Sequence, residues 1–409
     1  MKIENGQIKI IGAGTATITA TAAKSDQYFA ASASYSLRIR NAAGGWVDLG
    51  AFSLENAALT AYLNDAESSY TDTNDDTFTV MNKYVSGTYA SIDRKDCPAP
   101  VTITWDDPAS NSTVITIYED KTLVNKVCSQ SATNGTTSAE VYNLIPGLTY
   151  YYTVSEGSEI LEKGYFSTTG RRRMLKVSNT KGRGYANNCR DLGGLIVSDH
   201  GQPKTIKYGY LFRGTNMDKT TQAVEWPILL DFMNIGRDID LRNGETDGTN
   251  FGSEGSQNRY RPLPTSIDYT APGFKDSNNF PDLTVKEKVY EVVMAFFNTV
   301  KSGKAVYFHC YSGADRTGYI AMLIEGLLGV SEKDCSIDYE LTSFSVSGKR
   351  YRIGQDNALG SQDYDFRDGI KFLRELPGTT FQNKIETYLV GTVGISQQDI
   401  DDFKSRILE

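Results

Sequence analysis

The pattern of hydrophobic and polar positions changes partway along this 409-residue chain. Up to about residue 170, short runs such as VTITWDD, STVITIYED and TYYYTVSEG alternate apolar and polar residues between turn residues. A period of two is typical of strands that bury one face. Further on, strand-like runs such as AVYFHC alternate with longer helix-like runs such as TVKEKVYEVVMAFFNTVKSG. The sequence therefore predicts all-β modules followed by an α/β domain with a central sheet flanked by helices.

This pattern predicts four segments. Residues 1–42 contain three short strand-like runs with glycine turns, and residues 96–170 contain five strand-like runs, as in a β-sandwich. Residues 43–95 are predicted to be a linker or irregular segment, in which SLENAALTAYLNDAESS is compatible with a short helix. Residues 171–409 form the predicted α/β domain.

Composition and charge narrow the classes of partner. The net charge is −8 and the pI is near 5.1, so neither nucleic acid nor an anionic membrane is an expected partner, and any anion site must be local. Two histidines and five cysteines without metal-ligand spacing give no reason to expect a metal centre, another cofactor or a disulfide scaffold. No transmembrane run is visible, and residues 1–20 lack the basic-then-apolar order of a signal peptide.

The stretch VYFHCYSGADRTGYIAMLIEGLLG, which begins at Val306, combines a nucleophile with an anion site. Its first part reads as a buried strand and its last part as a helix with an apolar face. Backbone N–H groups in the loop between them and at the helix N-terminus provide a cradle for a tetrahedral anion and favour a thiolate at Cys310. Arg316 supplies a planar fork for two phosphate oxygens. The predicted phosphate-binding residues are Tyr311, Ser312, Gly313, Ala314, Asp315 and Arg316.

A cysteine followed by an arginine six positions later is a weak signal by itself. His309 before the cysteine, Gly313 inside the loop and Thr317 after the arginine strengthen it, as does the strand-loop-helix setting. The alternative is a buried structural cysteine at the end of a strand.

HCYSGADRTG resembles the signature loop of cysteine-dependent phosphatases of the protein tyrosine phosphatase class. More narrowly, residues from about 175 to 409 resemble a bacterial tyrosine phosphatase family that includes secreted phosphatases active on phosphoproteins and phosphoinositides. The matching stretches are NNCRDLGG, GYLFRG, DIDLRNGETD, LLGVSEKDCSIDYELTS and YLVGTVGISQQDIDDFKSRILE. The resemblance implies hydrolysis of a phosphorylated protein or a small phosphomonoester through a phosphocysteine on Cys310.

Two positions depart from the pattern of this family. Ala314 stands where the family commonly has a lysine, which removes a charge able to reach a second phosphate and argues against multiply phosphorylated inositides. Cys189 replaces the usual aromatic residue, and either packing or a redox partnership with Cys310 would account for it.

The β-modules also show resemblances. Residues 1–42 resemble the second half of a bacterial Ig-like domain of group 2, and a small β-appendage complete in itself is the alternative. LIPGLTYYYTV resembles the tyrosine corner of fibronectin type III domains, with Tyr150 as the corner residue. The resemblances imply a longer, exported chain that is periplasmic, surface-bound or secreted, with β-modules that act as spacers or contact a cell surface or a glycan.

Several polar residues have either a supporting role or an ordinary structural one. Asn188, Arg190 and Asp191 brace the catalytic loop, or they reflect the turn chemistry of Asp-Leu-Gly-Gly. His309 is expected to orient the loop, because neighbouring residues of a strand point to opposite faces.

Two arginines have an open assignment. Arg213 and Arg242 either face the anion site or pair with an acidic residue, for which the sequence offers Asp238 and Glu245. His200, in SDHGQP, is expected in a surface turn.

A general acid must protonate the leaving oxygen. Asp315 is the preferred candidate, because the resembling family places an aspartate at this position, and Asp240, in DIDLR, is the second. Asp276 and Asp282 lie on a separate stretch, GFKDSNNFPDL, but in no recognisable motif.

The expected function is that of a protein tyrosine phosphatase, with dual specificity as an extension. A phosphoinositide or inositol phosphate phosphatase is the first alternative, and a surface adhesion protein with an inactive phosphatase domain is the alternative from another class. Because every residue of the expected mechanism follows residue 180, the sequence also predicts that residues 172–409 retain activity on a small aryl phosphate.

Overall fold

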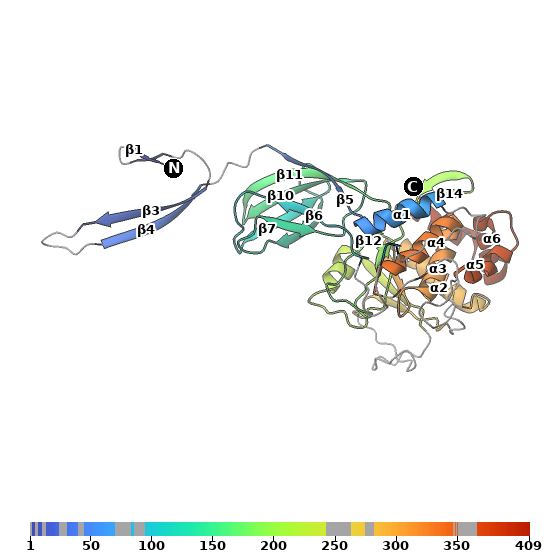
Figure 1. Cartoon of the computed structure of the whole chain (residues 1–409). Helices are drawn as coiled ribbons and strands as arrows, with labels where there is room; N and C mark the ends of the chain where they lie inside the picture. Colours follow the sequence, from blue (N-terminus) through green and yellow to red (C-terminus); the bar gives the residue numbers. More distant parts are fainter. Residues whose placement is uncertain are drawn as a thin grey trace. The chain divides into compact units, whose positions relative to one another are not determined.

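The structure is a computed structural model of the chain (Figure 1). It describes residues 2–4, 7–9, 14–23, 31–39, 45–69, 83–85, 95–242, 263–274, 282–346, 348, 350 and 366–409. The chain divides into two compact units. The first unit consists of Met1–Phe52, Val101–Val141 and Gly147–Thr168, and the second of Ser53–Pro100, Tyr142–Pro146 and Thr169–Glu409.

The first unit contains strands throughout its described part, as the alternating pattern predicts. Two antiparallel pairs come first, β1 (Lys2–Glu4) with β2 (Gln7–Lys9) and β3 (Gly14–Ala22) with β4 (Ala31–Ile39). A five-stranded sheet has the order β5-β11-β10-β7-β8, with bounds Val47–Ser53, Glu159–Thr169, Thr149–Glu156, Thr113–Tyr118 and Lys126–Ser131. A further antiparallel pair consists of β6 (Val101–Thr104) and β9 (Ser138–Val141).

In strand β10, the alternation of apolar and polar residues places every second side chain in the core. Tyr150, Tyr152 and Val154 are buried on one face of the strand. Tyr150 packs near Phe166 of the neighbouring strand β11, with ring centroids 5.8 Å apart. Burial of aromatic side chains at every second position holds this sheet against its core.

The second unit contains a six-stranded sheet in the order β12-β13-β16-β19-β17-β18. Its strands are β12 (Arg173–Met174), β13 (Arg190–Asp191), β16 (Leu211–Gly214), β19 (Ala305–His309), β17 (Ile235–Asp240) and β18 (Asp268–Thr270). The last four in this order are parallel to one another, whereas β12 and β13 pair in antiparallel fashion. This mixed sheet confirms the predicted α/β character of the C-terminal part.

Helices cover the sheet in the second unit (Figure 1). The α-helices are α1 (Ala57–Ser69), α2 (Lys286–Lys301), α3 (Asp315–Leu327), α4 (Glu332–Leu341), α5 (Phe366–Glu375), α6 (Phe381–Tyr388) and α7 (Gln397–Ile407). Shorter elements are the π-helical turns η2 (Pro227–Phe232) and η4 (Leu389–Val393), the 3₁₀ turn η3 (Thr342–Phe344) and the hairpin of β14 (Ile196–Asp199) and β15 (Gln202–Thr205).

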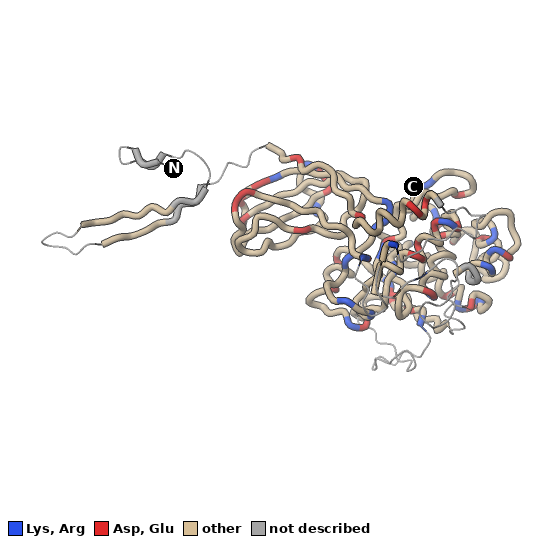
Figure 2. Tube along the Cα trace, viewed as in Figure 1, with Lys and Arg blue, Asp and Glu red and all other residues tan. Residues whose placement is uncertain are grey.

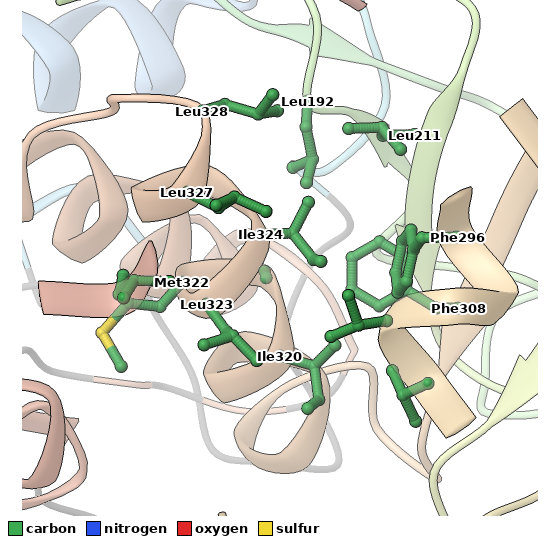
Figure 3. Close-up of a cluster of buried hydrophobic side chains, with 14 of the residues drawn as sticks. Leu192, Leu211, Phe296, Phe308, Ile320, Met322, Leu323, Ile324, Leu327 and Leu328 are labelled. Atoms are coloured by element: carbon green, nitrogen blue, oxygen red, sulfur yellow. The ribbon is translucent and has the colours of Figure 1, made fainter. Parts of the chain in front are cut away.

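The central strand β19 is buried on both faces, which explains its continuous apolar run. Val306 and Phe308 face the larger core with helices α2 and α3, and Phe308 meets Phe296 of α2 with ring centroids 5.0 Å apart (Figure 3). Ala305 and Tyr307 face a second core on the other side. The strand therefore holds its C-terminal end, and the loop that follows, in a rigid setting.

The short helix compatible with SLENAALTAYLNDAESS is present as α1. Residues 43–95 therefore contain both β5, in the five-stranded sheet, and α1, in the second unit. The boundaries predicted from the sequence remain a proposal for how the chain is organised into domains.

Acidic and basic side chains are interspersed along the described chain (Figure 2). In the part of the chain that the structure describes, no helix combines the length and apolar character needed to cross a bilayer.

Candidate active site

The loop between β19 and α3 is positioned by buried elements on both sides. Every residue of β19 and of α3 is buried, and Cys310 at the end of the strand is 2% exposed. Gly313 has φ +62°, and a Cβ at this position would lie 2.2 Å from the carbonyl oxygen of Gly214. Only glycine fits this loop position, because the backbone of the neighbouring strand lies against it.

The Cys310 thiol lies in an environment that favours its ionised form. Burial acts to raise the pKa of Cys310, but the Arg316 cation, with a smaller contribution from Thr317, outweighs it, so the pKa is lowered. Burial instead raises the pKa of Cys128 to about 11 and raises those of Cys189 and Cys335 as well. Of these four thiols, Cys310 is the one whose surroundings favour the thiolate.

The carbonyl groups of the loop are held from outside by two side chains. Asn188 Nδ2 donates to the carbonyl oxygens of Ser312 and Gly313, at 3.3 and 3.0 Å. Arg213 Nη2 donates to the carbonyl oxygens of Gly313 and Ala314, at 2.9 and 3.2 Å. Because a trans peptide directs its C=O and N–H to opposite sides, fixing these carbonyls leaves loop N–H groups for an anion.

A buried carboxylate holds the bracing side chains in turn. Asp338 of α4 accepts from Arg190 Nε at 2.5 Å and also pairs with Arg213. Arg190 Nη1 donates to Asn188 Oδ1 at 2.7 Å. Burial acts to raise the pKa of Asp338, but the two guanidinium groups outweigh it and lower the pKa. This network makes the loop a rigid frame.

The sequence pattern does not single out Asp338 as part of the site. A sequence feature that indicates its burial is its position inside CSIDYEL, between Ile337 and Tyr339, both of which are fully buried. A charged residue that shares a buried helical segment indicates a buried ion pair.

The three polar residues predicted around the loop divide into two groups. Asn188 contacts the loop, and Arg190 reaches it through Asn188. Asp191 instead pairs with Arg173 at 2.7 Å and accepts the N–H groups of Gly193 and Gly209, so the structure places it in turn chemistry.

His309 lies between two aspartates and the loop. Its Nε2 lies 3.0 Å from Asp238 Oδ1, and its Nδ1 lies 3.0 Å from the carbonyl oxygen of Cys310. Burial acts to lower the pKa of His309, but Asp238 and Asp240 outweigh it and raise the pKa to about 9. At neutral pH both ring nitrogens are therefore protonated, and Nδ1–H donates to the carbonyl oxygen of Cys310.

The arginines whose assignment was open are both paired. Of the alternatives for Arg213, pairing with Asp238 does not occur, because Asp238 faces His309 while Arg213 pairs with Asp338 and donates to the loop carbonyls. Arg242 pairs with Asp240 at 2.7 Å and with Asp218 at 2.6 Å. Glu245 lies outside the described residues.

The candidate acids differ in their surroundings. Asp315, 7% exposed, accepts from Arg350 Nε at 2.7 Å and Nη2 at 3.0 Å and from the Tyr339 hydroxyl at 3.0 Å. Asp240 is fully buried and accepts from Arg242, as well as from the Tyr269 hydroxyl at 3.0 Å.

Two other aspartates, Asp276 and Asp282, were also considered as acids. Asp282 is exposed and accepts from the backbone N–H of Thr284 at 2.9 Å just before α2, while Asp276 lies outside the described residues.

One further side chain lies beside the loop. The guanidinium of Arg183, which the sequence pattern does not single out, lies 4.6 Å from the ring centroid of Tyr311.

The described residues offer neither a disulfide nor a metal site. All five cysteines are free thiols, and Cys189 packs in a different core cluster from Cys310. The described residues contain no group of three or more His, Cys, Asp or Glu side chains that could hold a metal ion.

A parallel strand that ends just before Cys310, and a loop that leads to Arg316 in the first turn of a helix, place this site in a phosphatase-like α/β domain. The sequence model of the tyrosine phosphatase family matches residues 184–409, more than half of the chain, and the chain belongs to this family.

A curated relative supports the same class. A protein of Cupriavidus necator named "Putative tyrosine-protein phosphatase" is 26% identical over 169 residues, which cover 37% of this chain and 59% of that protein. The match thus spans about three fifths of the relative's length. Family and relative together support a phosphatase.

Proposed function

We propose that this protein is a cysteine-dependent phosphomonoesterase whose preferred substrate is a phosphotyrosine protein. The observation that carries the proposal is the lowered pKa of Cys310 at the base of a loop whose carbonyls are fixed outward by Asn188 and Arg213. A thiolate and an anion cradle at one point meet the two requirements for attack on a phosphate ester.

The reaction has two displacements. The Cys310 sulfur attacks phosphorus, an S–P bond forms, and the P–O bond to the leaving group breaks as that oxygen takes a proton from an acid. Arg316 and the loop N–H groups stabilise the equatorial oxygens in the transition state. Water then attacks phosphorus and gives a proton back to the same carboxylate, the S–P bond breaks, and phosphate leaves with regeneration of the thiolate.

Asp315 is the proposed general acid, with Asp240 as the second candidate. Asp315 lies at the first turn of α3, next to the phosphate loop, and Tyr339 and Arg350 hold its carboxyl group in place.

Substrate choice follows from what surrounds the loop. Ala314 gives the loop no cation for a second phosphate, which favours a single phosphate ester over a multiply phosphorylated inositide. The half-buried ring of Tyr311, with Arg183 above it, offers an aromatic surface beside the phosphate site. Phosphoserine, phosphoinositides and inositol phosphates are the comparison substrates.

The β-strand unit is proposed to contain a fibronectin type III-like sandwich preceded by an Ig-like segment. Burial of Tyr150 in β10 supports the first assignment. An extracytoplasmic location and a spacer role follow as proposals from these resemblances.

The proposal is tested by turnover of p-nitrophenyl phosphate and of a phosphotyrosine peptide, compared with phosphoserine peptides and phosphoinositides. Cys310→Ser should reduce turnover to the level of the uncatalysed reaction, because a serine hydroxyl remains protonated in a site that ionises a thiol. Equal activity of a folded Cys310→Ser variant would overturn the mechanism, and an inactive wild-type protein would favour a binding role.

A further inference from the structure

Residues 53–100 belong to the second unit, although they lie outside the stretch matched by the tyrosine phosphatase family. Helix α1 from this stretch packs against α4 and η3. The shared core cluster consists of Leu59, Tyr62, Leu63, Ala66, Val85, Met174, Ile337, Leu341 and Phe344. The Tyr62 hydroxyl also donates to Glu340 Oε2 at 2.6 Å in a buried setting. A buried apolar cluster with a buried hydrogen bond joins this stretch to the phosphatase fold.

A second contact places residues 95–97 beside the active-site frame. Asn56, at the start of α1, donates from Nδ2 to the carbonyl oxygens of Lys95 at 2.6 Å and Cys97 at 3.2 Å. The N–H of Lys95 donates to the carbonyl oxygen of Phe344 at 2.8 Å. Between these anchors, Asp96 is fully buried.

The Asp96 carboxylate reaches the residue that braces the phosphate loop. Its Oδ2 accepts the backbone N–H of Asn188 at 2.7 Å. Asn188 has φ +55°, in the left-handed region, where a non-glycine residue needs outside support. In this backbone conformation, the side-chain amide of Asn188 donates to the carbonyl oxygens of Ser312 and Gly313. The carboxylate therefore fixes the backbone from which Asn188 holds the loop.

We propose that Asp96 is a positioning residue of the phosphate loop, acting through Asn188, and that residues 53–100 are an integral part of the catalytic unit. This inference rests on the proposed phosphatase function. It assigns a role in that reaction to a stretch that precedes the matched family region by more than eighty residues along the chain.

Substitution of Asp96 in the full chain tests the proposal. In Asp96→Ala the Asn188 N–H loses its acceptor, and kcat for p-nitrophenyl phosphate should fall about tenfold with little change in KM. The acidic limb of the kcat/KM profile should move to higher pH, because a looser loop supports the Cys310 thiolate less well. Asp96→Asn keeps an oxygen acceptor and should recover most of the activity.

Tyr62→Phe is the matched control from the same stretch. It removes the hydrogen bond to Glu340, so unfolding should occur at lower urea concentration, while kcat and the pH profile should match those of the wild-type protein. If Asp96→Ala does not fold by circular dichroism, Asp96→Ser replaces it, because its shorter side chain does not reach the Asn188 N–H.

The outcomes separate the two proposals. A folded Asp96→Ala or Asp96→Ser variant with wild-type kcat and pH profile overturns the positioning role. The role is also overturned if Asp96→Asn is as impaired as the alanine variant in kcat, or if Tyr62→Phe shifts the pH profile equally. A wild-type protein without phosphatase activity overturns the proposed function instead.

Discussion

At the scale of single residues, the site depends on buried charges that each have a partner. Asp338 joins Arg190 and Arg213, and Asp238 faces His309. A charge removed from water is tolerated only when it is paired, so each of these side chains is held in one geometry. Cys310 differs from these side chains, because the Arg316 cation lowers its pKa while the proposed mechanism requires its sulfur to remain able to attack phosphorus.

Acid catalysis is tested by Asp315→Asn. Acid assistance matters most for a poor leaving group, so this variant should slow phenyl phosphate at least tenfold more than p-nitrophenyl phosphate. Steady-state kinetics on both substrates measure the ratio, with Asp240→Asn and Asp282→Asn as comparisons. Equal losses on both substrates would assign Asp315 to loop structure through its contacts with Arg350 and Tyr339.

His309 makes stability depend on pH. Its pKa is raised from 6.5 to about 9 in the folded protein, so the stabilisation is fully present below pH 6.5 and is lost as pH rises to about 9. The difference in unfolding free energy between wild type and His309→Gln should therefore shrink by about 3 kcal/mol over this window. Urea unfolding at several pH values measures it, and a constant difference would contradict the ion pair with Asp238.

At the scale of elements, the parallel strand β19 and the helix α3 define where the loop begins and ends. The strand is covered on both faces and the helix is buried along its whole length, so a shift of either end of the loop would disrupt close packing and cost free energy. Loop shape then depends on the few positions where the backbone approaches a neighbour. Gly313 is such a position, since a Cβ there would lie 2.2 Å from the carbonyl oxygen of Gly214.

Gly313→Ala should abolish most phosphatase activity. The added Cβ meets the backbone of Gly214, so the loop must move away from the position at which its N–H groups bind phosphate. Gly303→Ala is a matched control, because Gly303 also has a positive φ, +76°, but no atom within 4 Å of the added Cβ.

The control should cost about 1 kcal/mol of stability and leave kcat unchanged. Turnover of p-nitrophenyl phosphate and urea unfolding provide the two measurements. Full activity in Gly313→Ala would show that the loop accommodates a side chain there.

At the scale of the whole molecule, two compact units are built from interleaved stretches of chain. Residues on both sides of the β-strand segment 101–141 contribute to the second unit. The prediction that residues 172–409 suffice for activity is untested, and the proposed role of Asp96 opposes it, because this fragment lacks α1 and Asp96 and would expose the apolar cluster that α1 covers. The extracytoplasmic location and the surface or glycan contacts stay predictions.

Activity of the whole chain should not require a metal ion. Since the proposed nucleophile is a thiolate, turnover should persist in EDTA and be blocked by vanadate, a phosphate analogue, and by peroxide, which oxidises thiolates. Initial rates with and without each agent provide the measurement. Loss of activity in EDTA that a divalent metal restores would contradict the thiolate mechanism.

The sequence by itself determined the features that are local along the chain. Strand, loop and helix follow one another from residue 305 to residue 327, so their periods and the spacing of Cys310 and Arg316 are readable without a fold. The alternation in β10 predicted its buried face for the same reason. Local sequence determines local conformation, and here Cys310 and Arg316 lie at the two ends of one short loop.

Only the tertiary structure decided which distant groups meet at the loop. Asp338 lies 148 residues from Arg190 and 125 from Arg213, and Asp96 lies 92 residues from Asn188. An opposite charge on any neighbouring element can serve as the partner of a buried charge. Composition therefore gives no preference between Asp238 and Asp338 as the partner of Arg213. Packing of α1 and α4 made these choices, because close-packed elements leave each buried charge only the partners that its own position allows.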